Sequence, residues 1–217
     1  MWEFVAWDDR IIMDFRLFND RSMIVAGPSQ SGKSTFLLKM IRWKNELFRK
    51  PIHRVLWAYG QYQPYFHSLL QRECIQLHAG IPEVCDLQPY DLLILDDLLG
   101  PSETNTDMTT MFTQTAHHLP CFIVFVTQNI FPRGKEARTR SLNTHYFVLF
   151  KNPRDKSQIQ ILGRQMYPKK SKVMTAIYED ATKRPHGYLF IDLTQECPEE
   201  CRLRTDIFKT PMIIYQF

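Results

Sequence analysis

The chain lacks the cysteine pattern of a disulfide framework. It has five cysteines, an odd number, scattered at positions 74, 85, 121, 197 and 201. Such usage is typical of a reducing compartment. Cys197 and Cys201 have the spacing of half a zinc site, but no second Cys/His pair stands nearby at zinc-finger spacing. The sequence therefore indicates an intracellular protein and gives little support for a structural metal.

Long apolar runs are missing as well. No stretch approaches the ~20 residues that span a bilayer. The N-terminal residues 1–4 show no basic segment followed by an apolar run, so no signal peptide is apparent. We expect a soluble protein without a membrane partner. Internal repeats, low-complexity segments and long linkers are also absent from the sequence.

The composition is that of an ordinary globular protein with a slight excess of positive charge. The 217 residues are 44% hydrophobic and 23% charged, which suits one α/β domain with a sizeable core. The net charge of +4 is compatible with a nucleic-acid partner but does not establish one. We expect one domain over residues 1–217, with a lead-in strand in residues 1–22 and a C-terminal strand and tail in residues 185–217.

The dominant motif is a glycine-rich segment. It matches the pattern G-x-x-x-x-G-K-[ST] at every fixed position and reads Gly27-Pro28-Ser29-Gln30-Ser31-Gly32-Lys33-Ser34. Residues 22–26 predict a buried strand before it and residues 35–41 the first turns of a helix after it, which is the setting that the motif needs. The glycines let successive backbone N–H groups face one anion, and the helix N-terminus adds positive potential. This predicts a phosphate loop; the alternative is a glycine turn that merely opens a helix.

The loop residues have distinct expected roles with ATP and Mg²⁺. Lys33 would reach the β- and γ-phosphates, and the Ser34 hydroxyl would ligate Mg²⁺. The residues expected to bind the nucleotide are Gly27, Pro28, Ser29, Gln30, Ser31, Gly32, Lys33, Ser34 and Thr35.

Short apolar segments alternate with helical ones along the chain. Strands are predicted at residues 22–26, 54–59, 91–97, 121–127, 146–150 and 188–193, with a further edge strand possible at 11–17. Helices are predicted from the phosphate loop to about residue 49 and at 64–72, 107–118, 155–166 and 170–182. This alternation predicts an α/β fold with a parallel sheet flanked by helices.

Polar side chains follow two of these strands. Asp96 and Asp97 end the strand at 91–97, and Gln128 follows the strand at 121–127. Because parallel strands present their carboxyl ends at one edge of the sheet, we expect these residues to meet Lys33 there. Asp96 would act on Mg²⁺, Asp97 would be the general base for an attacking water, and Gln128 would hold the γ-phosphate or the water.

The strand at 54–59 separates the phosphate-loop strand from the acidic strand in the sequence. This favours the P-loop NTPases that place an additional strand between the two motif strands, the RecA/FtsK-like fold, and argues against simple nucleotide kinases. A small GTPase would need an Asn-Lys-x-Asp motif, which the sequence lacks.

Basic residues follow the Gln128 strand. Arg138 and Arg140 are candidates for an arginine that stabilises a transferring phosphoryl group, with Arg154 and Arg164 behind them. A solvated basic loop or a DNA-backbone contact is an equal alternative for any one of them. A second basic cluster, at 169–172, could face nucleic acid.

The motifs together resemble the FtsK/HerA superfamily of DNA-pumping ATPases. The resemblance covers roughly residues 20–170 and is strongest to the poxvirus-type viral genome-packaging ATPases, including the versions in Maverick/Polinton elements and adintoviruses. It rests on the phosphate loop, on Asp96-Asp97 after an apolar strand, and on the block that begins with Thr127-Gln128-Asn129 and runs to Asp155.

The resemblance implies a homo-oligomeric ring, a hexamer or pentamer, that hydrolyses ATP with Mg²⁺. Such a ring would drive double-stranded DNA of any sequence into a capsid, act with a capsid portal or vertex protein, and occur in the virion and in the host nucleus or cytoplasm. Lys33 and Ser34 match the Walker A pair, Asp96 and Asp97 the Walker B pair, and Gln128 the sensor glutamine.

Arg138 best matches the arginine position of that family. The chain departs from the family pattern at another residue, Asp97. FtsK-type pumps commonly have Glu where this chain has Asp97, whereas the poxvirus-type branch often has Asp there; a shorter base must lie closer to the water. No DNA-reading winged helix is recognisable, which agrees with a compact packaging motor. The alternatives are a nucleotide or nucleoside kinase and a non-catalytic, ATP-dependent assembly factor.

Overall fold

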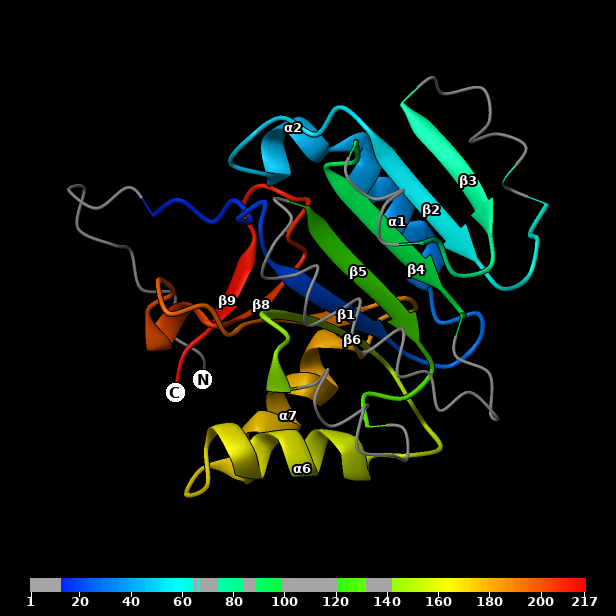
Figure 1. Cartoon of the computed structure of the whole chain (residues 1–217). Coiled ribbons are helices and arrows are strands. Elements are labelled where there is room, and N and C mark those ends of the chain that lie inside the picture. Colours follow the sequence, from blue (N-terminus) through cyan, green and yellow to red (C-terminus); the bar gives the residue numbers. More distant parts are fainter. Residues whose placement is uncertain (1–12, 65, 67–73, 84–88, 99–120, 132–141) are drawn as a thin grey trace.

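A nine-stranded β-sheet runs through the part of the chain that the structure describes (Figure 1). The structure is a computed structural model, and it describes residues 13–64, 66, 74–83, 89–98, 121–131 and 142–217. The strand order is β3-β2-β4-β5-β1-β6-β7-β8-β9. The strands are β1 Ser22–Ala26, β2 Val55–Tyr59, β3 Ile75–Ala79, β4 Leu92–Asp96, β5 Phe122–Thr127, β6 Tyr146–Phe150, β7 Tyr188–Asp192, β8 Leu203–Thr205 and β9 Ile213–Tyr215. The described helices are α1 Lys33–Arg42, α2 Lys44–Leu47, α6 Ser157–Met166 and α7 Ser171–Ala181, with a 3₁₀ turn at Glu199–Cys201.

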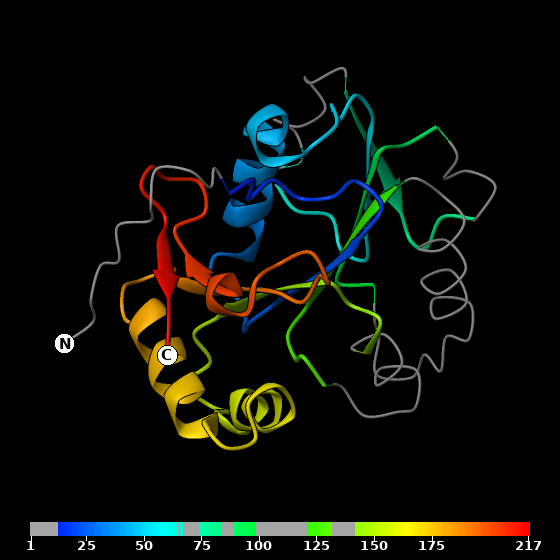
Figure 2. The same cartoon turned by 90° about the vertical axis from the view of Figure 1, so that its left-hand side faces the viewer.

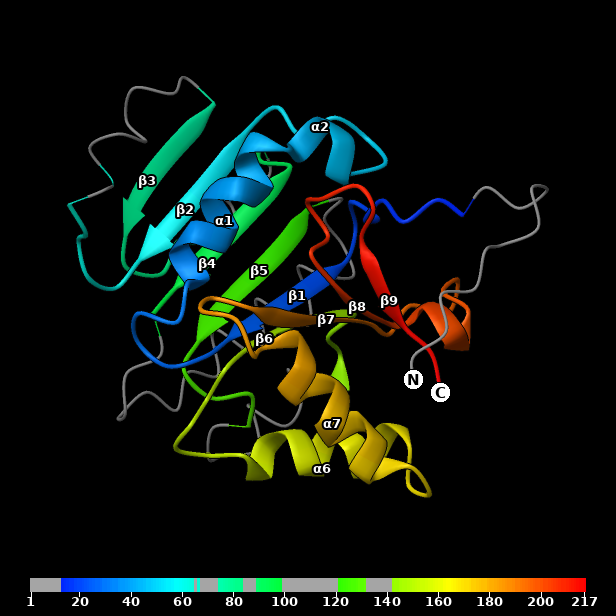
Figure 3. The same ribbon diagram turned by 180° about the vertical axis from the view of Figure 1, so that it is seen from behind.

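The sheet is parallel from β3 to β6 and antiparallel from β6 to β9. The prediction of a parallel sheet is therefore wrong for its last three strands. The reason is the number of helices between β6 and β7. Two helices, α6 and α7, connect these strands, so the chain runs away from the edge where β6 ends and then back to it (Figure 3). Strand β7 begins at that edge and must run antiparallel to β6.

Strand β5 lies between β1 and β4 and pairs in parallel with both. The expectation of a strand between the two motif strands is thus confirmed. The premise of that expectation was wrong, however: two strands, β2 and β3, intervene along the chain, and neither of them lies between β1 and β4 in the sheet. The residue pairs of the sheet place the ends of β1, β5 and β4 next to one another: Ala26 lies opposite Thr127, and Val126 lies opposite Asp96.

Both faces of the sheet are apolar, because successive side chains of a strand point to opposite faces. In β1, Met23 and Val25 face the cluster that includes α1, whereas Ile24 and Ala26 face the cluster that includes α6 and α7. Figures 2 and 3 show these helices on opposite sides of the sheet. The helices cover the faces with buried stripes: Phe36, Leu37, Met40 and Ile41 in α1, and Met174, Ile177, Tyr178 and Ala181 in α7.

The strand predictions for six segments are confirmed to within one or two residues, and the bounds of β1 and β6 agree fully. Helices α6 and α7 also lie where the sequence predicts them. The helix predicted at 107–118, and most of the one predicted at 64–72, lie outside the described residues. The edge strand predicted at 11–17 is reduced, in its described residues, to one isolated bridge between Leu17 and Phe48.

The helix after the phosphate loop ends earlier than predicted. Helix α1 stops at Arg42, Trp43 is the cap residue between the two helices with a φ of −101° and a ψ of 23°, and α2 ends at Leu47 rather than near residue 49. The next residue, Phe48, is extended and buried, and the backbone of Leu17 bonds to the residues on either side of it. Pairing with the lead-in segment therefore ends the helix, which a local pattern could not predict. No helix in the described ranges is long and apolar enough to cross a membrane.

Candidate nucleotide site

The phosphate loop connects β1 to α1 at the carboxyl edge of the parallel strands. Its first residue is anchored to β5, because the Gly27 N–H donates to the Thr127 carbonyl at 3.2 Å. The loop turns through two residues with positive φ, Gln30 at 63° and Gly32 at 112°. The Gly32 carbonyl then accepts from the Phe36 N–H at 2.9 Å and begins the helix. The local geometry is thus that of a tight, anchored loop at a helix start.

Lys33 lies folded back over this loop. Its Nζ donates to the carbonyls of Gly27 at 2.7 Å and Pro28 at 2.9 Å. Burial lowers the pKa of Lys33 below its usual value of 10.5, while the charges of Asp96 and Asp97 act to raise it. The two carboxylates therefore lie close enough to act on the ammonium, as the sequence expected of these three residues.

One polar atom of the loop is buried without a partner among the described residues. The Ser31 hydroxyl is shielded from solvent, makes no hydrogen bond and lies against Gly27, where an added Cβ would stand 2.7 Å from it. A buried hydroxyl without a partner is costly unless another group satisfies it. The other loop residues are more open: Ser34 is half-buried, and Ser29, Gln30 and Thr35 are exposed.

The acidic pair stands at the end of β4. Asp96 is half-buried, and its Oδ2 accepts a hydrogen bond from Nε1 of Trp57 at 3.3 Å. Trp57 lies fully buried in the neighbouring strand β2 and so holds the carboxylate from the side. Asp97 is exposed and has a φ of 52°, so the chain turns sharply directly after the strand. Its carbonyl would stand 2.3 Å from a Cβ at Gly60, so only glycine fits at Gly60.

Gln128 follows β5 and is exposed. It lines a small hollow together with Gly27, Asn152 and Asp155. The segment after it is held by Gln158 of α6, whose Oε1 accepts from the Ile130 N–H at 2.7 Å and whose Nε2 donates to Asn129 at 3.1 Å and to Asp155 at 2.7 Å. The hydrogen bonds from Ser157 and then Gln158 lower the pKa of Asp155. Gln128 thus lies next to the phosphate loop, on a segment that hydrogen bonds from Gln158 hold to α6.

The candidate arginines divide by position. Arg138 and Arg140 lie outside the described residues. Arg154 is exposed on the segment that follows β6, at the same edge as the phosphate loop. Arg164 lies in the last turn of α6, at the end of the helix away from that edge. The structure therefore favours Arg154 over Arg164 as a residue near the site.

The sequence argument missed two residues that contact the site. Trp57 reads as an ordinary apolar residue of a buried strand, and only its bond to Asp96 reveals the contact. His186 lies in the turn before β7, and its Nδ1 stands 3.2 Å from the carbonyl oxygen of Ser31. These partners are 39 and 155 residues apart in sequence, and no local motif marks either of them.

Cys197 and Cys201 were considered above as half of a zinc site, and the Cys197 thiol has a protein partner. Both are buried, and the Cys197 Sγ lies 3.2 Å from a guanidinium nitrogen of Arg204. Burial raises the pKa of Cys197 to about 11 and also raises that of Cys201. The described residues hold no group of three or more His, Cys, Asp or Glu side chains able to bind a metal. Mg²⁺ needs no such cluster, because it commonly binds one or two carboxylates together with waters and phosphate oxygens. Ser34 and Asp96 fit that pattern.

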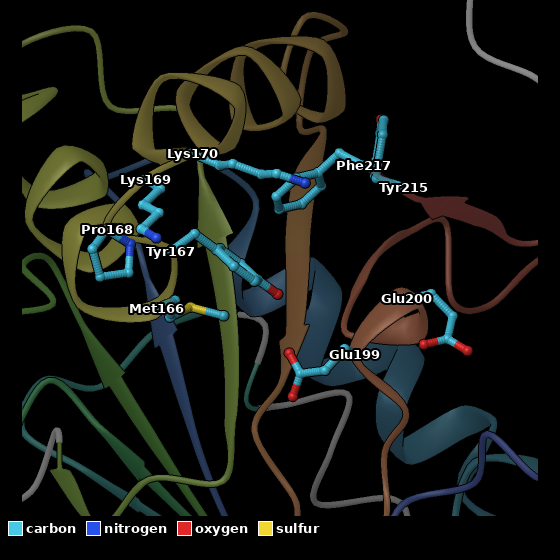
Figure 4. Close-up of a pocket in the computed structure, with 9 residues that line it drawn as sticks. All are labelled: Met166, Tyr167, Pro168, Lys169, Lys170, Glu199, Glu200, Tyr215 and Phe217. Carbon is cyan, nitrogen blue, oxygen red and sulfur yellow. The ribbon is translucent and has the colours of Figure 1, made fainter.

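A separate cavity of about 550 Å³ lies at the far edge of the sheet (Figure 4). Lys169 and Lys170 of the second basic cluster line it, but so do Glu199 and Glu200, and the aromatic ring of Phe217 lies under Lys170. Carboxylates beside the lysines make this an unfavourable surface for a DNA backbone.

Comparisons with known proteins do not assign this chain to a family. A scan against protein-family models found no match to the chain, and a search of curated proteins found none either. The resemblance to DNA-pumping ATPases therefore rests on the motif residues themselves.

Proposed function

We propose that this protein is an ATP-driven translocase of double-stranded DNA that packages a viral or virus-like genome into a capsid. One observation carries the proposal: the ends of β1, β5 and β4 lie side by side and present the phosphate loop, Gln128 and the Asp96-Asp97 pair. These are the groups that ATP hydrolysis requires, and they come from three segments far apart in the sequence.

The roles follow from chemistry and position. Backbone N–H groups of the loop from Ser29 to Ser34, other than that of Ser31, bind the phosphates of ATP together with the Lys33 ammonium. Ser34 and Asp96 would hold Mg²⁺, which would neutralise the charge that develops on the phosphate oxygens. Asp97 accepts the proton of the attacking water, and Gln128 orients that water or the γ-phosphate. Trp57 holds the Asp96 carboxylate from β2.

The finer assignment to the FtsK/HerA branch has two supports. The position of β5 between β1 and β4 agrees with P-loop NTPases that have an additional strand in this place. The block from Gln128 to Asp155 carries the sequence resemblance. In this proposal the chain forms a hexameric or pentameric ring, Arg138 completes the site of a neighbouring subunit, and basic residues contact DNA phosphates without reading bases.

ATPase measurements with and without duplex DNA test the proposal. We expect hydrolysis that requires Mg²⁺ and is stimulated by duplex DNA of any sequence, in a sample shown to be oligomeric by mass photometry. Lys33→Ala removes a charged phosphate contact and should weaken ATP binding roughly 10- to 100-fold. Lys39→Ala is the matched control, because Lys39 is exposed on the same helix.

Two further variants separate the alternatives. Asp97→Asn should retain ATP binding and lose turnover. If this variant retains the protein's biological activity although it no longer hydrolyses ATP, the chain is an assembly factor that uses ATP only to close an interface. Arg138→Ala should spare binding and lose turnover. Absence of stimulation by DNA in an oligomeric sample would reject translocation, and ATP consumption with a small acceptor in place of DNA would indicate a kinase.

A further inference from the structure

A turn from the antiparallel half of the sheet contacts the phosphate loop. The turn connects α7 to β7 and contains Arg184, His186 and Gly187. The His186 Nδ1 lies 3.2 Å from the Ser31 carbonyl oxygen. A carbonyl oxygen can only accept, so Nδ1 must carry the proton in this hydrogen bond.

The contact is close as well as polar. A Cβ at Gly32 would stand 3.1 Å from the Cβ and 3.2 Å from Nδ1 of His186, and 3.2 Å from the ring of Phe150. His186 and Phe150 of β6 therefore both pack against the loop at Gly32, where a side chain would otherwise stand. Gly32, at a φ of 112°, leaves the space that this packing needs.

The turn that presents His186 is itself held in place. Arg184 pairs with Asp206 at 2.6 Å, and the Gly187 N–H donates to the Arg184 carbonyl at 3.0 Å. His186 has a φ of 59°, in the left-handed region that costs free energy for a residue with a side chain, although histidine occurs there more often than most residues. The turn is thus anchored and strained, and it holds the imidazole of His186 against the loop.

The direction of the peptide explains what this contact does. In a planar trans peptide the C=O and the N–H point in opposite directions. With the Ser31 carbonyl directed at His186, the N–H of Gly32 points away from His186 and, among the described residues, has no acceptor. Backbone N–H groups of a phosphate loop bind the anion, and a Gly32 N–H without a protein acceptor can serve as one of them.

We infer that His186 is a positioning residue of the phosphate loop, which holds the Ser31–Gly32 peptide with the Gly32 N–H turned toward a bound phosphate. The inference rests on the proposed nucleotide-binding function and adds to it a residue from outside the motif. Without the imidazole the peptide can rotate, and its carbonyl oxygen can then face the phosphates and oppose binding.

Two substitutions separate this role from the strain of the turn. His186→Gly removes the imidazole but suits a φ of 59°, so the melting temperature should stay the same or rise. His186→Asn keeps an N–H donor close to the position of Nδ1 and also tolerates this backbone conformation. Lys183→Ala, on the exposed part of the same turn, is the control.

The measurement is binding of ATP and ADP with Mg²⁺ by isothermal titration calorimetry, together with KM and kcat. His186→Gly should weaken binding of both nucleotides about fivefold, which is about 1 kcal/mol, and raise KM with kcat unchanged. His186→Asn should bind both nucleotides within about twofold of the wild-type affinity, a difference of about 0.4 kcal/mol. Lys183→Ala should bind like the wild type.

Three results would overturn the inference. The first is unchanged nucleotide binding in His186→Gly, and the second is failure of His186→Asn to restore binding. The third is a fall in both the melting temperature and the nucleotide affinity that is the same in His186→Gly as in His186→Asn. A wild-type chain that binds neither nucleotide would instead reject the proposed function. The two failures are therefore distinguishable.

Discussion

The two described glycines with positive φ provide a matched pair of substitutions. Gly32, in the phosphate loop, has a φ of 112°, and Gly80, after β3, has a φ of 83°. Both conformations disfavour a residue with a Cβ. Their surroundings differ: a Cβ at Gly80 meets nothing within 4 Å, whereas a Cβ at Gly32 meets His186 and Phe150 at 3.1–3.2 Å.

The difference in surroundings sets the expected magnitudes. Gly80→Ala should cost only the conformational term, about 1–2 kcal/mol. Gly32→Ala should cost that term plus about 1–3 kcal/mol for forcing atoms into a packed site. One kcal/mol corresponds to about 2–4 °C in a domain of this size. We therefore expect a fall in melting temperature of about 5 °C for Gly80→Ala and about 10 °C for Gly32→Ala.

Nucleotide binding should separate the pair more sharply than stability. The added methyl at Gly32 displaces the peptide that we propose faces the phosphates, so Gly32→Ala should lose at least tenfold in ATP affinity, about 1.4 kcal/mol. Gly80→Ala should bind ATP like the wild type. Thermal unfolding by circular dichroism and calorimetric titration with ATP measure both quantities. If Gly32→Ala unfolds and binds ATP as Gly80→Ala does, the reasoning about the packed loop is wrong.

Three further predictions concern residues around the site and in the core. Trp57→Phe removes the donor to Asp96 and should raise the Mg²⁺ concentration for half-maximal ATPase activity severalfold, by about 1 kcal/mol; an unchanged requirement would contradict the contact. Arg204→Met leaves the buried Asp192 carboxylate without the cation that lies 2.6 Å away, so this variant should lower the free energy of unfolding by about 3–5 kcal/mol. Adding Asp192→Leu to Arg204→Met should recover part of that loss, as measured by thermal melts. Burial raises the pKa of Cys121 to about 12 from an ordinary value of 9.0, so the stability that this thiol contributes is full below pH 9 and falls as the pH rises toward 12. The slope is about 1.4 kcal/mol per pH unit, and Cys121→Ala should make the alkaline limb of the stability curve shallower.

Much of the fold followed from local patterns. Apolar runs bounded by turns and polar residues predicted β1 and β6 to the residue and four more strands closely, because strands buried on both faces need continuous apolar sequence. The antiparallel direction of β7 could not be predicted, since it depends on a pair of helices returning the chain to the same edge. The end of α2 at Leu47 depends in the same way on pairing between Leu17 and Phe48.

The candidate site divides along similar lines. Lys33, Asp96 and Gln128 were predictable because each follows or ends a buried strand, and parallel strands end at one edge. Trp57 and His186 were not, because their importance lies only in contacts with Asp96 and Ser31 across the fold. The sequence placed Arg138 near the site, and that prediction concerns a residue outside the described ranges.

The sequence by itself determined the residues of the candidate site: a glycine-rich loop whose residue order suits phosphate binding, and acidic and amide side chains at strand ends. Those properties are local, since conformational freedom and side-chain type travel with the residue. The tertiary structure decided the order β1-β5-β4, the burial of Lys33 and the contact of His186 with the loop. These depend on which distant segments pack together, because burial and hydrogen-bond partners belong to the folded chain.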